Sequence, residues 1–222
     1  MSTSNLVEFH RFFFTPVWRF QYPDWENESE IFIKYLLRDN LYLNERERNN
    51  LVITRANLHK EPAMRRITDF IQSSCEDAMG ILGFEKSCGI TSMWATKQKQ
   101  GGFHHRHFHA NAFLGASMAV FDSDGASAGT VFDNMDIHKY GLHPAVDKEK
   151  RQLLPPSEYL HFHPGSLLVF PAWAVHHTIP NNSNKRINIG ANIMPVGKTN
   201  HDHFDRYNFP DPLTLEMKEF EG

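Results

Sequence analysis

Cysteine is scarce in this sequence, which has only Cys75 and Cys88 among 222 residues. Two cysteines are too few for a disulfide scaffold, and their spacing matches no zinc-binding motif. The N-terminus lacks a charged segment followed by an apolar one, so no signal peptide is expected. No run of about 18 apolar residues is present, so no segment is expected to span a membrane. Together these absences favour a protein of the reducing cytoplasm.

An excess of basic residues is also missing. Lysine and arginine total 23, aspartate and glutamate total 26, and the formal net charge is -3. Proteins that bind nucleic acids usually present a basic surface, so nucleic acid is not an expected partner. The length suits one domain with a sizeable core, and neither an internal repeat nor a low-complexity tract divides the chain. We therefore expect residues 1–222 to form a single domain.

The N-terminal region, residues 8–87, is expected to contain a strand and two helices. Residues 8–20 are dense in aromatic side chains, which favours a strand, and Pro16 would interrupt it. After Asp24, apolar residues recur at helical spacing and predict the first helix. Either Asp24 or Asn27 could cap it.

A second, longer helix is expected after Pro62, which fits a first helical turn. Apolar residues follow at spacings of three and four, and Gly83 could end the helix. Cys75 falls on the apolar stripe, so it is expected in the core rather than as a reactive nucleophile. Residues 41–59, between the two helices, are polar and irregular and are expected to form a loop.

From Cys88 onward the pattern changes from helical to strand-like. Short runs rich in β-branched and aromatic residues alternate with glycine, proline, asparagine and aspartate, which is typical of an antiparallel barrel or sandwich. The runs are 90–97, 113–121, 129–132, 159–162, 166–170 and 186–194. Residues 88–195 are therefore expected to form the β core, with the two helices outside one sheet. Residues 133–156 are expected to be a long loop and residues 196–222 a loosely packed tail.

The stretch GGFHHRHFHANAF, residues 101–113, concentrates four histidines. Imidazole is the commonest metal ligand among side chains, although a solvated histidine-rich loop is the simpler interpretation. On a strand, residues i and i+2 face the same side, so a His-x-His pair presents two imidazoles together. Four such pairs occur: His105/His107, His107/His109, His161/His163 and His201/His203. A pair alone is weak evidence, and a histidine from another strand is needed to complete a metal site.

A second segment, HPGSLLVFPAWAVHHTIPNN at residues 163–182, supplies that histidine. His176 follows an apolar run and is separated from His107 by enough chain for several strands, so the two could converge. Two of the His-x-His pairs are less suited to the site. The pair His161/His163 lies only about one strand and one turn before His176, and the pair His201/His203 lies in the polar tail.

The segments HFHANAFLGASMAV and PGSLLVFPAWAVHHTIPNNSNKRINIGANI resemble the Fe(II)/2-oxoglutarate-dependent oxygenases, and most closely a branch found in marine bacteria and phages. The resemblance extends over most of residues 9–195. That branch has His-x-His where the wider superfamily has His-x-Asp. Its other motifs are matched by Phe13–Pro16, by Trp94, by Phe170–His176 and by the pair Arg186 and Asn188.

The sequence departs from this branch beside the metal motif. Ala110 stands where proline is usual, and Gly115-Ala116 and Met118-Ala119 replace a Ser-Gly pair and a tyrosine pair. These changes alter the expected wall of the pocket. The family's substrate therefore does not carry over, whereas the residues expected at the metal and the co-substrate are retained.

The resemblance implies a mainly β fold with N-terminal helices, a double-stranded β-helix or jelly roll. Fe(II) would be bound by His107, His109 and His176, with open positions for 2-oxoglutarate and O2. Arg186 would pair with the C5 carboxylate of 2-oxoglutarate, because a guanidinium matches a carboxylate with two hydrogen bonds. Asn188, two residues on and facing the same way, would donate to the same group.

The implied enzyme is a 2-oxoglutarate-dependent dioxygenase that hydroxylates an unidentified small-molecule or peptidyl substrate and releases succinate and CO2. Other ligand sets stay open at the level of the sequence. His105 could pair with His107, whereas His177 is expected to point away from the metal. Three aspartates could replace His109 as a carboxylate ligand: Asp122, Asp124 and Asp133.

A rival interpretation is a cupin, which shares the jelly roll and often binds metal through three histidines and one glutamate. Gly101 followed by His107-Phe108-His109 matches the opening of the first cupin motif, and the second is matched in part by Gly165, Pro171 and His176. The expected glutamate is missing, because positions 113 and 114 are phenylalanine and leucine. The alternatives are thus a cupin-type three-histidine metalloenzyme that does not use 2-oxoglutarate, or a non-catalytic jelly-roll binding protein. Only a keto-acid user needs the Arg-x-Asn pair.

Overall fold

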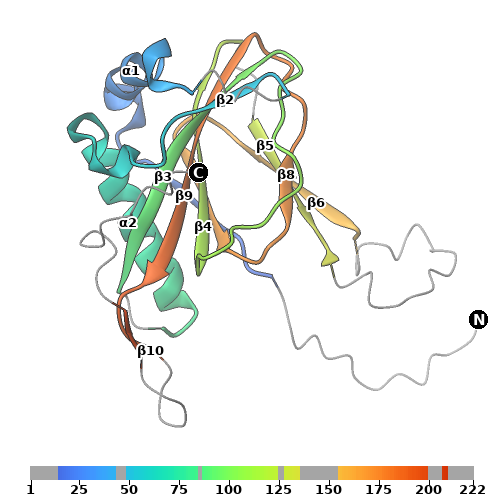
Figure 1. Ribbon diagram of the computed structural model, residues 1–222. Coiled ribbons are helices and arrows are strands. Elements are labelled where there is room, and N and C mark those ends of the chain that lie inside the picture. Colours follow the sequence, from blue (N-terminus) through green and yellow to red (C-terminus); the bar gives the residue numbers. More distant parts are fainter. Residues whose placement is uncertain are drawn as a thin grey trace, which may run out of the picture.

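The computed structural model describes residues 15–43, 49–84, 87–124, 128–135, 155–199 and 207–209. Within them, a six-stranded and a three-stranded antiparallel sheet form two layers, and two helices lie on the outer side of the larger sheet (Figure 1). The fold is therefore mainly β with N-terminal helices, as the sequence predicts.

The larger sheet has the strand order β1-β7-β4-β9-β3-β2. Its strands are β1 (Trp18–Gln21), β7 (Ser166–Pro171), β4 (Leu114–Asp122), β9 (Lys185–Pro195), β3 (Cys88–Lys99) and β2 (Leu51–Ile53). The three long strands β4, β9 and β3 pair along most of their length. Strands β1 and β2 join this sheet from the N-terminal region, so the sheet extends beyond the predicted range of 88–195.

The smaller sheet has the order β6-β5-β8, with β6 (Ser157–Phe162), β5 (Ala128–Asp133) and β8 (His176–Thr178). Strand β8 follows the apolar run of β7 and pairs with β5, where His176 lies opposite Phe132. A separate two-stranded sheet joins β10 (Gly197–Thr199) and β11 (Tyr207–Phe209). This pair lies in the segment expected to be a loosely packed tail.

The longer helix, α2 (Arg65–Ile81), follows the short 3-10 turn η4 (Pro62–Met64) and packs on β3, β4 and β7. Its apolar stripe is spaced at three and four residues, which places one side of the helix against the sheet. The buried members of this stripe are Ile67, Ile71, Cys75, Ala78 and Met79. The predicted helix and the core position of Cys75 are both confirmed.

The shorter helix, α1 (Trp25–Leu36), begins directly after Asp24. Asp24 occupies the N-cap position, but its side chain makes no capping hydrogen bond to the backbone. Its Oδ1 instead accepts a hydrogen bond from Nδ2 of Asn27, at 2.6 Å, inside the first turn. Phe32 and Leu36 lie on the inner side of the helix and are buried.

The prediction of a loop over residues 41–59 is wrong in part. This segment contains strand β2 and the 3-10 turn η3 (Leu58–Lys60), and it is preceded by the 3-10 turn η1 (Asp39–Leu41). Strand β2 forms through pairing with β3, and three residues are too few to show a strand period. Residues 8–14 of the predicted first strand and residues 136–154 of the predicted long loop lie outside the described residues.

The larger sheet separates two apolar layers. On strand β9, Ile187 and Ile189 face the core beneath the helices, and the alternate residues Arg186 and Asn188 face the smaller sheet. The layer between the sheets is small, and its buried apolar residues are Ala119, Phe132, Leu168, Phe170 and Ala174. Polar side chains fill the rest of this layer, and the predicted site lies among them.

Candidate metal centre

Backbone pairing brings the two histidine segments together. The amide N–H of His107 donates to the carbonyl of His176 at 2.9 Å, and the reverse bond has the same length. The amide of His109 donates to the carbonyl of Ala172 at 2.9 Å. The segment that carries His107 and His109 is not a regular strand, but it lies antiparallel to the residues before β8, so alternate side chains face inward.

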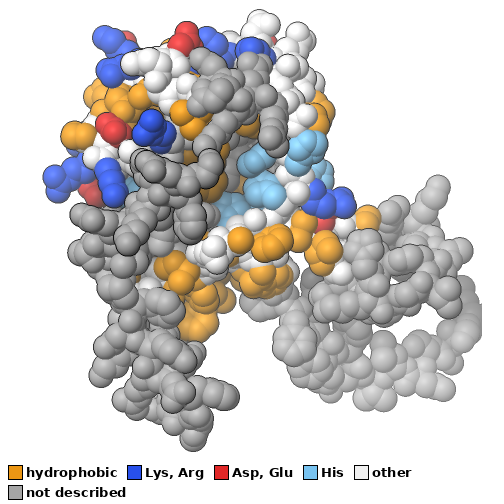
Figure 2. All heavy atoms as spheres, in the orientation of Figure 1, with side chains coloured by type: hydrophobic (Ala, Val, Ile, Leu, Met, Phe, Trp, Pro, Cys, Tyr) orange, Lys and Arg blue, Asp and Glu red, His pale blue; other side chains and the backbone are white. Residues whose placement is uncertain are grey.

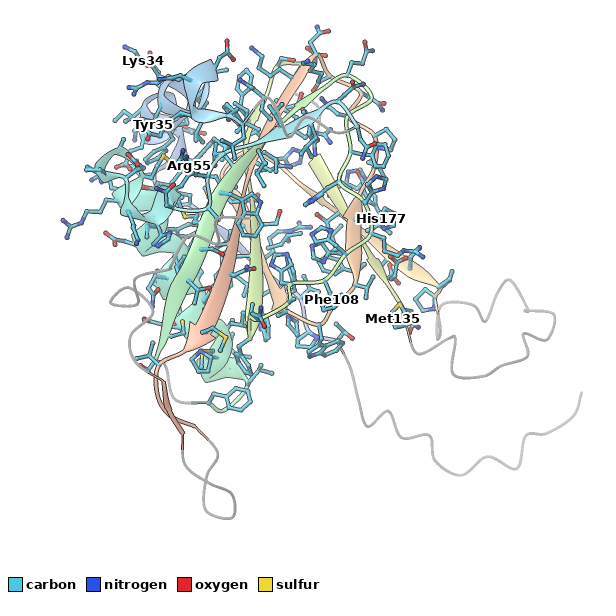
Figure 3. All side chains as sticks on the ribbon, viewed as in Figure 1. Lys34, Tyr35, Arg55, Phe108, Met135 and His177 are labelled. Carbon is cyan, nitrogen blue, oxygen red and sulfur yellow. The ribbon has the colours of Figure 1, made fainter. Side chains whose placement is uncertain are left out.

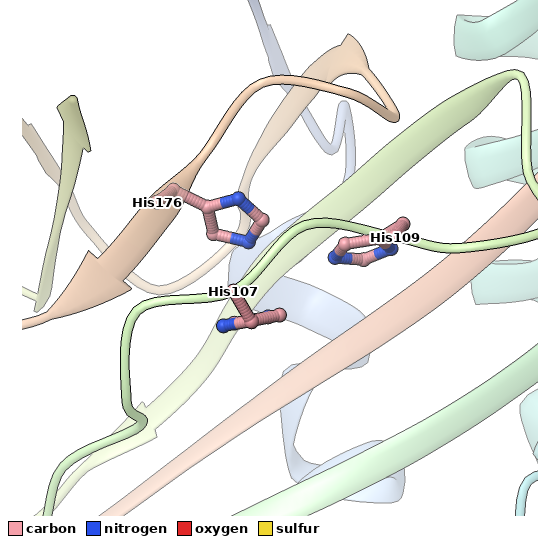
Figure 4. Close-up of side chains that lie close together, drawn as sticks. All are labelled: His107, His109 and His176. Carbon is pink, nitrogen blue, oxygen red and sulfur yellow. The ribbon is translucent and has the colours of Figure 1, made fainter. Parts of the chain in front are cut away.

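The side chains of His107, His109 and His176 converge on one point (Figure 4). One ring nitrogen of each lies within 4.8 Å of the others. His109 and His176 are buried and His107 is half-buried. Phe108 stands between the two paired histidines and points outward, with 58% of its surface exposed. Among the described residues, these three histidines form the group that could hold a metal ion.

Hydrogen bonds fix which nitrogen of each ring is available. The Nδ1 of His107 lies 2.7 Å from the carbonyl oxygen of His105, and that of His176 lies 2.8 Å from the carbonyl of Ala174. A carbonyl oxygen can only accept, so both Nδ1 atoms carry the proton and both Nε2 atoms keep a lone pair. Such outer partners are usual for histidines that bind metals.

In the third ring, that of His109, Nδ1 is also engaged, but its partner is a side chain rather than a backbone carbonyl. The Nδ1 of His109 lies 2.6 Å from Oδ1 of Asn192 on β9. Gly115 on β4 leaves room for this ring, because a Cβ there would lie 3.1 Å from Nδ1 of His109 and 2.5 Å from the ring of Phe170. The three histidines therefore fit a transition metal bound through three Nε2 atoms.

The electrostatic environment keeps these rings neutral. Burial, together with the neighbouring His107, lowers the pKa of His109 to about 4 and that of His176 to about 3. Burial also lowers the pKa of His107. Since only a neutral imidazole offers a lone pair to a metal, the site is in its ligating form at neutral pH.

The alternative ligands considered from the sequence are directed elsewhere. The Nε2 of His105 lies 2.6 Å from Nδ2 of Asn49. His177 follows His176 on strand β8, so its side chain faces the other side of that strand, and its Nδ1 lies 3.2 Å from Oδ2 of Asp133 (Figure 3). Asp122 pairs with Arg186.

The other two aspartates are also engaged outside the centre. The carboxylate of Asp133 pairs with the guanidinium of Arg106: Nε lies 2.9 Å from Oδ2, and Nη2 donates to Oδ1 at 3.1 Å. Asp124 is exposed and accepts a hydrogen bond from the backbone of Asn184. None of the three aspartates joins the histidine group within the described residues.

A fourth histidine, His104, also borders the site, and its position was not foreseen from the sequence. Its ring centre lies 4.1 Å from that of His107, and its backbone N–H donates to Oγ1 of Thr178 at 2.8 Å. Burial and the neighbouring histidines lower its pKa to about 4. Histidine spacing gives no signal for this contact, because it depends on how the segment passes strand β8.

A cavity between the two sheets opens beside the three histidines. Figure 2 shows histidine side chains gathered on this face of the molecule. The cavity is lined by residues of strands β3, β4, β5, β8 and β9 and by the histidine segment. The lining includes Trp94, Thr96, Gln98, His104, Ser117, Thr130, Thr178, Asn188 and Gly190. A Cβ at Gly190 would lie 2.7 Å from the indole of Trp94, so glycine allows the indole to lie against β9.

The pair expected to bind the keto acid is only partly at this cavity. Asn188 lines it, is buried, and has no hydrogen-bond partner for Oδ1. Arg186 faces the same way but is 3% exposed, and its Nε lies 3.2 Å from Oδ2 of Asp122. Arg186 is not among the described residues that line the cavity. The ion pair with Asp122 was not foreseen, because it depends on the register of β4 against β9.

Residues 92–192 match a family model described as a putative 2OG-Fe(II) oxygenase. The matched range contains the three histidines together with Arg186 and Asn188. The expectation of an oxidoreductase of the 2-oxoglutarate-dependent type is confirmed by this match. A comparison with curated proteins finds no matching sequence.

Solved structures of low sequence identity share the fold. The α-ketoglutarate-dependent epimerase SnoN from nogalamycin biosynthesis is 13% identical, with a TM-score of 0.62 over 90% of this chain and 91% of that chain. HygX from Streptomyces hygroscopicus, solved with nickel, 2-oxoglutarate and hygromycin B, is 10% identical, with a TM-score of 0.56 over 82% and 83%. A Pseudomonas putida prolyl-4-hydroxylase is 12% identical, with a TM-score of 0.54 over 82% and 93%. The predicted double-stranded β-helix is thus confirmed.

Proposed function

We propose that this protein is an Fe(II)- and 2-oxoglutarate-dependent oxygenase that hydroxylates its substrate and releases succinate and CO2. The observation that carries the proposal is the convergence of three neutral imidazoles, two buried and one half-buried, whose Nδ1 atoms are all engaged. This centre lies inside the segment that matches the oxygenase family model. We place the chain in the His-x-His branch of that superfamily, on the motif at His107 and His109.

Iron would be held by His107, His109 and His176. Iron and 2-oxoglutarate, when bound, would supply the oxidising power that inserts one oxygen atom of O2 into a substrate C–H bond, the other atom entering succinate. A three-histidine set contributes no negative charge, unlike the usual pair of histidines and one carboxylate. The keto acid would therefore bring the anionic groups that balance the metal.

The chain's own residues keep this arrangement in place before any ligand binds. Arg106, beside His107, makes its two contacts with Asp133 at the end of β5. The backbone N–H of Asp133 in turn donates to the carbonyl of Val175, at 2.9 Å. The two histidine segments are thus tied to one strand from outside the centre. Such support reduces the reorganisation needed for metal binding.

We propose Arg186 and Asn188 as residues that bind the distal carboxylate of 2-oxoglutarate. Support comes from their burial, from their shared side of β9 and from the unpartnered Oδ1 of Asn188. A buried polar atom without a partner is uncommon in a folded protein, and it is expected where a ligand completes the site.

The proposed substrate is a small molecule or a peptidyl group, which the enzyme would oxidise with O2. The proposed location of this reaction is the cytoplasm. Two of the similar structures are an epimerase of nogalamycin biosynthesis and a protein solved with hygromycin B, and a third is a prolyl hydroxylase. The net charge of -3 gives no support to a nucleic-acid substrate. No helix among the described residues is long and apolar enough to cross a membrane.

The proposal is tested by adding 2-oxoglutarate to the anaerobic Fe(II) protein and recording the visible charge-transfer absorption of the chelate. We expect the band in the wild type and its loss when His176 is replaced by alanine. Metabolite pools are then screened for substrate-dependent release of succinate. Tight Fe(II) binding with neither the band nor 2-oxoglutarate binding would favour the cupin-type alternative.

A further inference from the structure

Gln98 occupies the cavity with the candidate metal centre, and neither the sequence motifs nor the proposed function assigns it a role. It lies near the end of β3, where its neighbours Lys97 and Lys99 point to the opposite side of the sheet. The side chain is 1% exposed, which is unusual for a residue that brings a polar carboxamide into the interior. It lines the same cavity as the three histidines and Asn188.

The carboxamide oxygen of Gln98 has no hydrogen-bond partner. Only three buried side-chain atoms among the described residues share this property, and two of them, on Gln98 and Asn188, belong to this one cavity. Buried carboxamides are normally satisfied, because an unmade hydrogen bond loses the interaction that water would have provided. Two such atoms at one end of a cavity indicate that a polar ligand completes them.

Strand register places Gln98 beside the two residues proposed for the keto acid. Gln98 lies opposite Arg186 in the pairing of β3 with β9, and Arg186 lies opposite Asp122 in the pairing of β9 with β4. Asn188 lies two residues along β9, opposite Thr96. Because Asp122 already holds Nε of Arg186, the formal charges of that pair cancel. Thr96 also lines the cavity at this end, and the buried atoms there without a hydrogen-bond partner are the oxygens of the two carboxamides.

We infer that Gln98 binds the distal carboxylate of the keto acid, together with Asn188 and in front of the Arg186–Asp122 pair. This inference rests on the proposed function. A carboxylate only accepts hydrogen bonds, and a carboxamide donates from its NH2 group. Rotation of the terminal amide by half a turn exchanges oxygen and nitrogen with almost no change in shape. Both carboxamides can therefore turn donors toward an anion, and Gln98 favours a co-substrate with an anionic distal end.

The test compares two keto acids that share the C1 carboxylate and the 2-oxo group. 2-Oxoglutarate carries the distal carboxylate, and 2-oxopentanoate has a methyl group in its place. Each is titrated by calorimetry into the Ni(II)-loaded protein, wild type against Gln98→Leu. We expect 2-oxoglutarate affinity to fall about tenfold, equal to about 1.4 kcal/mol, and 2-oxopentanoate affinity to stay unchanged. Gln98→Glu should weaken 2-oxoglutarate further, because it places two carboxylates together.

Gln100→Leu is the matched control, since this glutamine is exposed just beyond the same strand, and it should alter neither affinity. Equal 2-oxoglutarate affinity in the wild type and Gln98→Leu would overturn the inference and leave the proposed function intact. An equal loss for both keto acids would also overturn it, because the effect would not depend on the distal carboxylate. Failure of the wild type to bind 2-oxoglutarate at all would overturn the proposed function and this inference with it.

Discussion

The Nδ1 atom of His109 lies 2.6 Å from the Oδ1 atom of Asn192, 83 residues further along the chain. Like the backbone carbonyls beside His107 and His176, this contact engages Nδ1 of the ring and leaves Nε2 free. Asn192 lies on β9 opposite Gly115, whose missing side chain leaves the space that the His109 ring occupies. The surroundings of His109 thus suit a neutral imidazole ring.

Replacing Asn192 by alanine should lower metal affinity by roughly 10- to 100-fold, the usual effect of removing an outer partner of a metal-binding histidine. Asn192→Asp should retain most of the affinity, because its carboxylate also accepts from Nδ1. Competition titration with Co(II) measures both values. Asn182→Ala, at an exposed asparagine, serves as the control. Unchanged affinity in Asn192→Ala would mean that His109 does not need this partner.

Removal of a proposed ligand should have a larger effect than removal of an outer partner. His109→Ala should therefore lower Fe(II) affinity by more than about 100-fold. His105→Ala is a close control, because this histidine is two residues from His107 and contacts Asn49 instead. The measurement is anaerobic Fe(II) titration of both variants. Equal Fe(II) affinity in His109→Ala and the wild type would remove His109 from the ligand set.

The parts of the fold that were predicted from the sequence are those with long, regular patterns. Helix α2 and strand β9 each carry enough apolar residues for the period to be read directly. Strands β2 and β8 have three residues each and exist because a neighbouring strand pairs with them. A single sequence does not contain that pairing information, so β2 was interpreted as loop.

The site divides in the same way. The three histidines that meet in space were identified from an i, i+2 pair and a family motif, both of which are local in sequence. Asn192, Gln98 and the Asp122 partner of Arg186 were not identified. Each is a single polar residue on a strand, and its role depends on the register of β3, β9 and β4. Contacts set by register between distant strands leave no local pattern.

The two thiols should be unreactive in the native protein. Burial, the neighbouring Cys88 and Glu76 raise the pKa of Cys75 well above 9.0, and burial and Glu76 raise the pKa of Cys88 to about 12. Because the thiolate is the reactive form, a chromogenic disulfide reagent at pH 8 should label neither until the protein is unfolded. Rapid labelling of the native protein would contradict this burial.

The same pKa shifts predict how stability depends on pH. In the unfolded chain both thiols ionise near pH 9, whereas in the folded protein they stay protonated there. The unfolded state then binds fewer protons, so the free energy of unfolding should fall as pH rises above about 9. Urea unfolding between pH 7 and 10.5 measures this change. A Cys75→Ala/Cys88→Ala variant should show a smaller fall over the same range.

Variants of the ion pair between Arg186 and Asp122 can distinguish a structural role of Arg186 from a role in binding 2-oxoglutarate. Both side chains are almost fully buried, with 3% and 2% exposed. Arg186→Leu removes the cation beside a buried carboxylate, which typically costs about 3 to 5 kcal/mol of stability. It should also lower 2-oxoglutarate affinity, by up to two or three powers of ten if the guanidinium meets the distal carboxylate.

A double variant distinguishes the two effects. Arg186→Leu/Asp122→Leu removes both charges, and replacing a whole buried pair by apolar residues is often neutral for stability. We expect the double variant to recover most of the lost unfolding free energy and to regain none of the 2-oxoglutarate affinity. Urea unfolding and anaerobic titration of the Fe(II) protein measure the two quantities. Recovery of both together would show that Arg186 acts only through the stability of the sheet, and the cationic contact with the keto acid would have to be abandoned.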